Sequence, residues 1–375
     1  MINRLRRVLS DKKIRACLQC AACSGCCPSA RASPFRIRKL IRQIQLGSSG
    51  AFLKNDLSWL CVMCYKCLER CPKDVNIPYV VCALRDLAIR KGVAPKNVVA
   101  LKRNIDAYGN PYGLDNSLRW DWVNYTGAKV KVEGGGAETV YFVGCLSSYM
   151  GRLQEIPYAI SLILDKAGED WTFLNEELCC GHPLLLAGFI NEFKELAARN
   201  VKAVEDIEAK RLVTGCPGCT VAFRKEYPEI LGRKLSFEVL HFSELLNRYV
   251  KQRRIRLRRF ISRVTYHDPC ELSRLLNVFE DPRIVLRGFV SRFVECRESL
   301  TNSNCCGAGG LVKLSDPQLS DSLAKMRLGE LIDTGAEVCV TACPACKLNL
   351  SEAALELGGI QIMDLSELVS QQLSR

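Results

Sequence analysis

Two short stretches, "CCGHP" (residues 179–183) and "CCGAGG" (residues 305–310), place adjacent cysteines before a glycine twice, 126 positions apart. Adjacent cysteines seldom form a disulfide with each other, because the small ring that such a bond closes is strained. Two neighbouring thiolates can, however, both reach one polynuclear metal centre. The other cysteines that recur with these pairs therefore decide the fold and the chemistry.

Each pair belongs to a set of five cysteines, with one cysteine upstream and a C-P-x-C turn downstream. The first set is Cys145, Cys179, Cys180, Cys216 and Cys219, and the second is Cys270, Cys305, Cys306, Cys343 and Cys346. Matching cysteines are offset by 125, 126 and 127 positions, and the flanks agree, as in "FSELL" beside "LSELV". Such a close register over three landmarks indicates an internal duplication.

Short β-branched runs end at the cysteines of both copies. They are "TVYFVG" and "RLVTG" in the first copy, and "RVTYHD" and "VCVTA" in the second. Strands that alternate with helical patterns predict parallel α/β layers, in which sites form beyond the carboxyl ends of the strands. We therefore expect two α/β domains related by a pseudo-twofold axis, over residues 138–255 and 256–375. Each should gather its five thiolates at one edge of its sheet.

The amino-terminal third contains two motifs of another kind, "CLQCAACSGCCP" (17–28) and "CVMCYKCLERCP" (61–72). Both read C-x2-C-x2-C-x3-C-P, the spacing of a two-cluster [4Fe–4S] ferredoxin, in which the fourth cysteine ligates the other cluster. The expected ligand sets are Cys17, Cys20, Cys23 and Cys71 for one cubane, and Cys61, Cys64, Cys67 and Cys27 for the second. Zinc knuckles are the alternative, but they do not explain the repeated fourth cysteine with its proline.

The surroundings of these motifs predict helices. Ile37, Leu40, Ile41 and Ile44 recur at helical spacing before Gly47, and "IPYVVCALRDLAIRKG" (77–92) carries a proline in its first turn. Residues 1–95 are thus predicted to form a helical two-cluster ferredoxin domain. Residues 96–137 are predicted to be an irregular connector whose tryptophans pack against a neighbouring domain.

Composition limits the classes of protein. The chain has 375 residues, of which 48% are hydrophobic and 25% charged, as expected of a soluble protein with several domains. No apolar run approaches the roughly 20 residues of a membrane span, and the amino terminus lacks the apolar core of a signal peptide. The 22 cysteines therefore indicate metal ligation rather than disulfides. We expect a cytoplasmic protein, with docking on the inner face of a membrane as an additional possibility.

The net charge of +13 does not predict nucleic-acid binding. Part of the excess Lys and Arg balances the negative charge of thiolate-bound clusters. The basic run "KQRRIRLRRF" (251–260) has one aromatic residue and lies at the expected boundary between the duplicated copies. It is interpreted as a solvated linker or docking face.

Several residues leave alternatives open. A thioredoxin-like dithiol at either C-P-x-C turn would leave the upstream cysteines unexplained, whereas zinc in one of the two sets needs four thiolates only. Cys26, Cys82, Cys296 and Cys339 are not among the expected ligands; the last three are expected to be buried fillers, and Cys26 either a buried thiol or one that contacts a ligand cysteine. His182 and His267 lie beside the predicted centres, where each either donates a hydrogen bond or proton or simply packs. His241 lies far from any cysteine along the chain and is given no role.

Two segments resemble the heterodisulfide reductases. "GSSGAFLKNDLSWLCVMCYKCLERCPKDVNIPYVVCALRDLA" (47–88) resembles their C subunit, and the pattern C-x(31–39)-CC-x(35–36)-C-x-x-C resembles the CCG domain of their B subunit. The whole chain resembles a C-like part fused to a B-like part, as in the D subunit of this family. Each five-cysteine copy is accordingly termed a CCG domain.

The resemblance implies two non-cubane [4Fe–4S] clusters, one in each five-cysteine set, besides the two cubanes; zinc or an empty site is the alternative for one set. It implies that electrons enter from a membrane cytochrome b or a flavin/iron–sulfur protein and cross the cubanes. They would cleave a small anionic disulfide of the CoM-S-S-CoB type between the CCG clusters. The ten CCG cysteines, His182 and His267 are then the catalytic candidates.

Similar chains also serve as electron-transfer iron–sulfur subunits of flavin-dependent glycerol 3-phosphate, glycolate or lactate dehydrogenases, which deliver electrons to quinone. This is the alternative function. The completeness of both five-cysteine sets favours the reductase.

Overall fold

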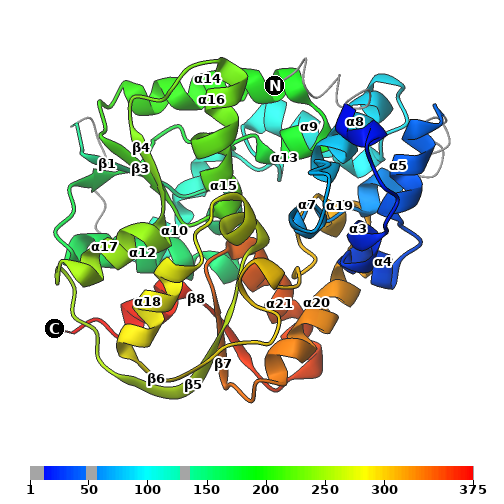
Figure 1. Ribbon diagram of the computed structural model, residues 1–375. Helices are drawn as coiled ribbons and strands as arrows, with labels where there is room; N and C mark the ends of the chain where they lie inside the picture. Colours follow the sequence, from blue (N-terminus) through cyan, green and yellow to red (C-terminus); the bar gives the residue numbers. More distant parts are fainter. Residues whose placement is uncertain (1–11, 48–56, 127–135, 375) are drawn as a thin grey trace.

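The computed structural model describes residues 12–47, 57–126 and 136–374 (Figure 1). The amino-terminal basic stretch, part of the segment that resembles a reductase C subunit, and most of the glycine run at 134–136 lie outside these residues. Within the described residues, no helix has both the length and the apolar character that a bilayer span requires.

The amino-terminal domain is helical, as predicted. Its elements are α2 (Lys12–Arg15), α3 (Ala22–Gly25), α4 (Pro28–Ala32), α5 (Ile37–Gln45), η2 (Leu57–Leu60), α7 (Lys66–Glu69) and α8 (Ile77–Arg90). The apolar face of α5 buries Ile37, Leu40 and Ile41. Helix α8 begins with the Asn76 side chain accepting the Tyr79 amide, and Pro78 lies in its first turn. The two helices expected from periodicity are therefore confirmed.

The connector differs from the prediction, because most of its described part is helical. It contains α9 (Lys96–Tyr108), η3 (Asn116–Trp120) and α10 (Asp121–Thr126). Val98, Leu101 and Ile105 form a buried stripe along α9, which ends at Gly109 in a left-handed conformation. The packing of the connector's tryptophans is confirmed, since Trp120 stacks on Phe173 with ring centroids 4.0 Å apart.

Two four-stranded parallel sheets follow, with the strand orders β2-β1-β3-β4 and β6-β5-β7-β8. The first consists of β1 (Thr139–Phe142), β2 (Trp171–Thr172), β3 (Arg211–Thr214) and β4 (Glu238–His241). The second consists of β5 (Phe260–His267), β6 (Val290–Val294), β7 (Val338–Thr341) and β8 (Gln361–Asp364). The four predicted strands are β1, β3, β5 and β7. Strands β1 and β7 are buried along their whole length, as expected of parallel sheets covered on both faces.

Helices cover the sheets and join the copies. The first copy contains α11 (Cys145–Tyr149), α12 (Glu155–Lys166), α13 (His182–Ala187), α14 (Ile190–Glu205), α15 (Pro217–Val221), α16 (Tyr227–Leu231) and α17 (Phe242–Lys251). The second contains α18 (Glu280–Phe289), α19 (Val312–Ser315), α20 (Pro317–Ile332), α21 (Pro344–Leu357) and α22 (Leu365–Gln371). Helix α12 packs on α22 and α17 on α18. One hydrophobic cluster includes Tyr141 and Val213 of the first sheet with Tyr266 and Val340 of the second. The two copies therefore share a core.

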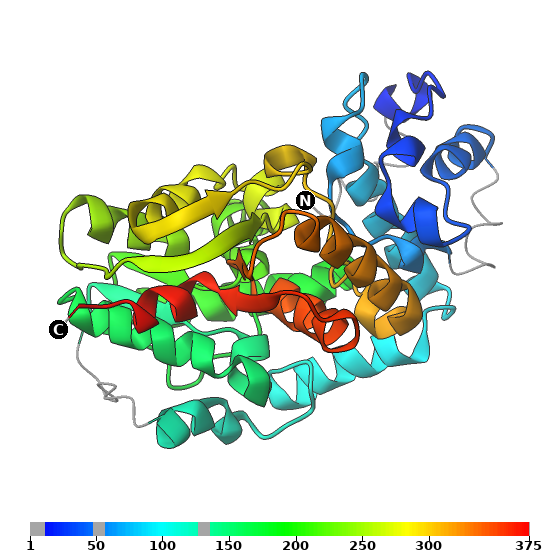
Figure 2. The ribbon, with the colours of Figure 1, turned by 90° about the horizontal axis from the view of Figure 1, so that it is seen from below.

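The ferredoxin-like domain lies against the same side of both copies (Figures 1 and 2). Helix α8 contacts α13 of the first copy, whereas α4 contacts α20 of the second. The basic run 251–260 leaves the end of α17 and leads into β5, so it connects the two sheets.

Candidate iron–sulfur centres

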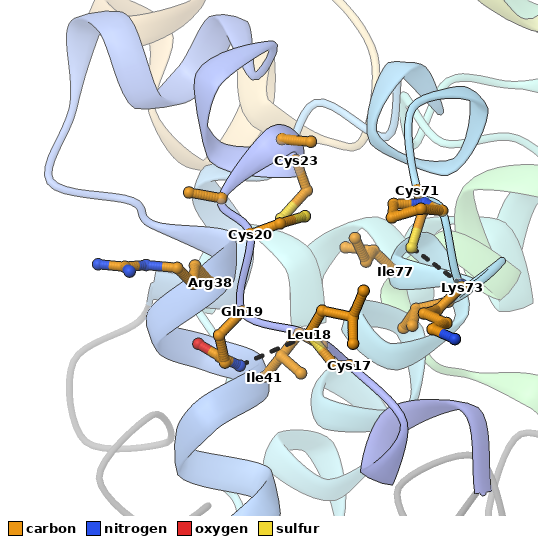
Figure 3. A pocket seen from close by; sticks show the side chains of 14 residues that line it. Cys17, Leu18, Gln19, Cys20, Cys23, Arg38, Ile41, Cys71, Lys73 and Ile77 are labelled. Carbon is orange, nitrogen blue, oxygen red and sulfur yellow. Dashed lines mark hydrogen bonds between the residues drawn. The ribbon is translucent and has the colours of Figure 1, made fainter.

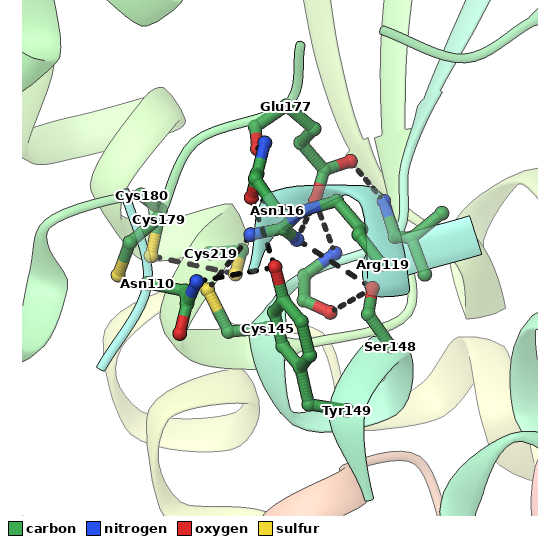
Figure 4. A network of polar contacts seen from close by, with 12 residues as sticks. Asn110, Asn116, Arg119, Cys145, Ser148, Tyr149, Glu177, Cys179, Cys180 and Cys219 are labelled. Carbon is green, nitrogen blue, oxygen red and sulfur yellow. Dashed lines mark hydrogen bonds and ion pairs between the residues drawn. The ribbon is translucent and has the colours of Figure 1, made fainter. Parts of the chain in front are cut away.

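The five thiols of the first CCG copy lie together where its strands end. Cys145 begins α11 just after β1, and Cys216 precedes α15 just after β3. The Cys219 thiol donates to the Cys180 sulfur at 3.4 Å. Thiol–thiol hydrogen bonds also join Cys145 to Cys179 and Cys216 to Cys219. Figure 4 shows Cys145, Cys179, Cys180 and Cys219 of this set close together.

The second copy repeats the arrangement. The Cys306 and Cys346 sulfurs lie 3.2 Å apart, and further thiol–thiol contacts join Cys270 to Cys305 and Cys343 to Cys346. Each set of five cysteines therefore forms one group at the carboxyl edge of its sheet.

The second cysteine of each CCG pair has a lowered pKa. Hydrogen bonds from Cys179 and Cys219 lower the pKa of Cys180 to about 7. Hydrogen bonds from Cys305 and Cys346 likewise lower the pKa of Cys306 to about 6. Each copy thus offers a thiolate, the form of cysteine that binds metals.

The donor sets fit iron–sulfur clusters. All 22 cysteines are free thiols, and eight of the ten CCG cysteines are buried, with Cys216 and Cys270 half-buried. Five thiolates cannot share one buried site without a compensating cation, because burying unpaired charge is strongly unfavourable. Clustered sulfur donors select soft metals such as those of iron–sulfur centres, or zinc.

The ferredoxin motifs form two hollows. Cys17, Cys20, Cys23 and Cys71 line the first (Figure 3), and Cys27, Cys61, Cys64 and Cys67 line the second. The structure therefore groups three cysteines of each motif with the fourth of the other. In the first hollow Cys20 is exposed and the other three are half-buried, whereas all four cysteines of the second are buried.

Backbone strain marks both ferredoxin loops at the same positions. Gln19 and Ala21 in the first motif, and Met63 and Tyr65 in the second, have positive φ between 50° and 66°. A non-glycine residue in this region costs roughly 1–2 kcal/mol and persists where its surroundings impose it. The strain turns successive cysteines of each loop toward one hollow.

The connector supplies an arginine to the first CCG set that sequence reasoning missed. Arg119 is fully buried; its Nη2 donates to the Cys145 sulfur at 3.4 Å and its Nη1 to Glu177 Oε1 at 2.6 Å (Figure 4). Glu177 also accepts the amides of Val143 and Gly144. Burial opposes the charge on Arg119, but Cys145 and Glu177 outweigh it and raise its pKa, so it remains a cation. The sequence feature that could have pointed to this role is the charge of Arg119 next to the tryptophans of "RWDW" (119–122).

The structure places His182 at the contact between the two copies. Its Nδ1 lies 2.9 Å from Glu226 Oε2 of the first copy, and its Nε2 lies 2.9 Å from Glu271 Oε1 of the second. Burial opposes protonation, but the two carboxylates outweigh it and raise the pKa of His182 well above its ordinary value. Glu271 follows Cys270 directly, and sequence reasoning did not select it.

His267 lies at the second CCG set. One of its ring nitrogens is within 4.8 Å of the sulfurs of Cys306 and Cys346. Arg327 Nε donates to its Nδ1 at 3.1 Å, so the neutral ring carries its hydrogen on Nε2. Burial, aided by Arg327, lowers the pKa of His267 to about 3. Nε2 has no hydrogen-bond partner in the described part of the chain.

His241, given no role from the sequence, caps α17 by accepting the Ser243 amide. Burial lowers the pKa of His241 to about 3, against the opposing influence of the Gly215 and Ala342 backbone. These two residues directly precede Cys216 and Cys343. The ring therefore lies near both C-P-x-C turns, although it is far from any cysteine along the chain.

The cysteines outside the motifs are mostly buried, as expected. Cys82, Cys296 and Cys339 are buried, and Cys26 is half-buried with its thiol directed to the Cys23 carbonyl at 3.5 Å. Cys296 accepts a hydrogen bond from Arg327 at 3.4 Å.

The second hollow is packed against the second CCG set. Val62 and Cys64 share a small hydrophobic cluster with Cys305, against which Cys270 also packs. Arg274, four residues after Cys270, donates to the Cys64 carbonyl at 2.7 Å and also to the Ser303 carbonyl. A Cβ at Gly309 would lie 2.8 Å from the Val62 carbonyl, and one at Gly310 would overlap the Cys61 carbonyl. Only glycines permit this approach.

Comparisons with known proteins agree with these centres. Residues 13–75 match the 4Fe-4S dicluster domain family, and residues 139–224 and 264–351 match the family described as cysteine-rich domain. The described thiol groups and these two families together define an iron–sulfur oxidoreductase.

Similar proteins identify the family to which this iron–sulfur oxidoreductase belongs. The D subunit of dihydromethanophenazine:CoB–CoM heterodisulfide reductase from Methanosarcina acetivorans is 37% identical over 84% of this chain and 77% of its own length. Its counterpart from Methanosarcina barkeri is 32% identical over 96% of this chain and 94% of its own length. The chain belongs to the family of heterodisulfide reductase D subunits. The B subunit of fumarate reductase (CoM/CoB) from Methanothermobacter marburgensis is 27% identical over 97% of this chain and 73% of its own length.

Proposed function

We propose that this protein is the catalytic subunit of a disulfide reductase that cleaves a small anionic disulfide of the CoM-S-S-CoB type. The observation that carries the proposal is the presence of two complete thiol sets in copies that share a core and are linked by His182 and Glu271. Relatives named as subunits support a partner that supplies electrons, either a membrane cytochrome b or a flavin/iron–sulfur protein.

The ligand assignment follows the grouping of the thiols. Cys17, Cys20, Cys23 and Cys71 hold one cubane cluster, and Cys61, Cys64, Cys67 and Cys27 hold the other. The first CCG cluster is held by Cys145, Cys179, Cys180, Cys216 and Cys219, and the second by Cys270, Cys305, Cys306, Cys343 and Cys346. When bound, these clusters supply single-electron transfer, whereas cleaving a disulfide into two thiols takes two electrons and two protons.

The two cubane sites and the second CCG site follow one another from the surface into the protein. The exposed Cys20 edge belongs to the first hollow, and the second hollow is buried against Cys270 and Cys305. Arg274 donates to the carbonyl of Cys64, and Gly309 and Gly310 allow the backbone at Cys61 and Val62 to approach closely. These residues keep the second ferredoxin loop and the second CCG set at a short, fixed separation.

The contact between the copies holds protons for the product thiols. His182 carries a proton on each ring nitrogen, one shared with Glu226 and one with Glu271. Against a hydrogen bond from Cys346, burial and, to a lesser extent, Cys216 and Glu271 raise the pKa of Cys343. A hydrogen bond from Cys219 lowers the pKa of Cys216, which burial and Glu271 oppose. Arg327 occupies Nδ1 of the neutral His267 ring, so the ring hydrogen is on Nε2, and one ring nitrogen lies within 4.8 Å of the Cys306 and Cys346 sulfurs.

The test is anaerobic purification with analysis of iron, sulfide and zinc, followed by oxidation of reduced benzyl viologen on addition of the CoM–CoB disulfide. We expect disulfide-dependent oxidation that Cys306→Ser abolishes while the signals of the ferredoxin-like domain persist. Intact clusters without disulfide-dependent oxidation would refute the proposal.

A second function is electron transfer alone, as the iron–sulfur subunit of a flavin-dependent dehydrogenase. The relative from a fumarate reductase favours it, because that enzyme is named for the reduction of fumarate rather than for disulfide cleavage. The five thiols of the second set also leave zinc as a candidate there, because four thiolates can hold it. Zinc in that set, with an EPR spectrum that does not respond to thiols, would favour this function.

A further inference from the structure

The segment that forms most of the first hollow carries charges of one sign. The described segment 12–47 contains eight basic residues and no acidic residue. All eight are exposed to solvent; they are Lys12, Lys13, Arg15, Arg31, Arg36, Arg38, Lys39 and Arg42. Arg38 and Lys73 line the hollow itself (Figure 3). The eight residues of this segment are termed the basic face.

The three α5 cations of the basic face lack the neutralising partners found elsewhere on the molecule. In the CCG copies, exposed cations form ion pairs such as Lys202–Asp206, Arg233–Glu205 and Arg248–Glu238. Among the residues the structure describes, no acidic side chain pairs with Arg38, Lys39 or Arg42 of α5. Their field therefore extends into solvent over about a Debye length, roughly 8–10 Å at physiological salt.

The basic face is built to meet a charged surface rather than to enter a bilayer. The apolar residues Ile37, Leu40 and Ile41 of α5 face the domain core, so its fully exposed side chains are those of Arg38, Lys39 and Arg42, followed by Leu46 at its end. Close to Cys20, Leu18 is 62% exposed and forms a small apolar spot within the basic surroundings. A small apolar contact ringed by charge suits a transient encounter, of which electron-transfer complexes are typical.

We propose that the basic face docks a redox protein with an acidic surface, which exchanges electrons at the exposed Cys20 edge of the first hollow. The inference rests on the proposed function in one respect, that Cys17, Cys20, Cys23 and Cys71 hold a redox-active cluster. The charge complementarity speeds the encounter and orients the partner, and it does not require tight binding.

The test uses flavodoxin hydroquinone, a small acidic electron donor, in stopped-flow reduction of the full-length protein. The variant Arg38→Glu/Lys39→Glu/Arg42→Glu reverses three exposed charges of α5 that make no ion pair. We expect its second-order rate constant to fall at least tenfold at about 20 mM salt and to approach the wild-type value at about 0.5 M salt. Photoreduction by neutral 5-deazariboflavin should be unchanged, which shows that the clusters are intact.

The matched control is Lys166→Glu/Lys234→Glu/Lys251→Glu, which changes the net charge equally with exposed residues of the first CCG copy. We expect less than a twofold change in rate for the control.

Equal slowing of the two triple variants, or a wild-type rate independent of salt, would overturn the docking proposal. If the wild type instead binds phosphatidylserine vesicles while the α5 variant does not, and the flavodoxin rate is the same in both, the docking proposal is overturned in favour of a lipid surface. If the protein does not cleave the disulfide but its rate of reduction by flavodoxin depends on salt, the proposed function is refuted and the docking proposal is still supported.

Discussion

The two CCG copies have matching cysteine sets and the same strand order, but they differ directly after the CCG motif. The first copy continues with His182, Pro183 and Leu184, and the second with Ala308, Gly309 and Gly310. In the first copy the histidine connects Glu226 to Glu271 across the contact between the copies. In the second copy the glycines allow the backbone at Cys61 and Val62 to approach. The duplicated loop therefore serves two different contacts.

The charges around the two sets also differ. Arg119 donates to the Cys145 sulfur in the first copy, whereas no described arginine donates to a CCG cysteine sulfur in the second. At the end of β5 the second copy has His267, and Phe142 ends β1 in the first. The first centre thus receives a hydrogen bond from a buried guanidinium, whereas a neutral imidazole lies beside the second. The two copies share a ligand set but differ in the residues around it, so they are not interchangeable. Each of these differences can be tested separately.

The largest effect is expected for Gly310→Ala. The new Cβ would overlap the Cys61 carbonyl at a residue with positive φ, so the second CCG loop must move away from the ferredoxin loop. Strain and overpacking together should lower the free energy of unfolding by about 2–4 kcal/mol. A displacement of about 1 Å at such a contact should reduce viologen-linked disulfide reduction by roughly 10²-fold.

The control for this substitution is Gly329→Ala. Gly329 lies within α20 and has open space at its Cβ position. Helix propensity predicts a small gain in stability of up to about 1 kcal/mol with unchanged activity. Urea denaturation and the viologen assay measure both variants; equal behaviour of the two would show that the close approach at Gly310 has no role.

A smaller effect is expected for Arg119→Gln. Loss of the charge and of the N–H···S hydrogen bond should make the reduced state of the first CCG centre less favourable. Its midpoint potential should fall by on the order of 50–100 mV, the equivalent of one charge-assisted hydrogen bond, while the second centre is unchanged. EPR-monitored redox titration measures both centres. Arg119→Lys, which retains the charge, should recover part of the shift, and equal shifts of both centres would contradict the prediction.

The smallest effect concerns the helix caps that occupy matching positions, His241 before α17 and Asp364 before α22. Burial and the neighbouring Glu367 raise the pKa of Asp364 to about 7 from 3.8. The neutral carboxyl is thus preferred in the folded protein, so its stabilising contribution is complete below pH 3.8 and is lost as the pH rises through about 7. His241, whose pKa is lowered from 6.5 to about 3, acts in the opposite sense and loses stability as the pH falls through this range.

Asp364→Asn keeps the capping oxygen but cannot ionise. We expect its melting temperature, relative to the wild type, to rise by a few degrees between about pH 5 and about pH 7.5. Differential scanning calorimetry at several pH values measures the shift. A difference that does not change with pH would show that Asp364 titrates in the folded protein as it does in the unfolded chain.

Much of the fold could be predicted because its signals are local. The period of α5 and α8, the four β-branched runs and the repeated register of the cysteines each depend on short stretches of chain. The grouping of Cys71 with Cys17, and of Cys27 with Cys61, also followed from motif spacing. The helix α9 was missed, although its stripe of Val98, Leu101 and Ile105 has the same period.

The amino-acid sequence by itself determined which cysteines belong together, because thiol spacing and strand periodicity are properties of neighbouring residues. Only the tertiary structure decided what surrounds each group. Arg119 meets Cys145 across 26 positions, and His182 meets Glu271 across 89. Contacts of this kind depend on how the packed layers bring distant segments side by side, and no local pattern specifies that packing.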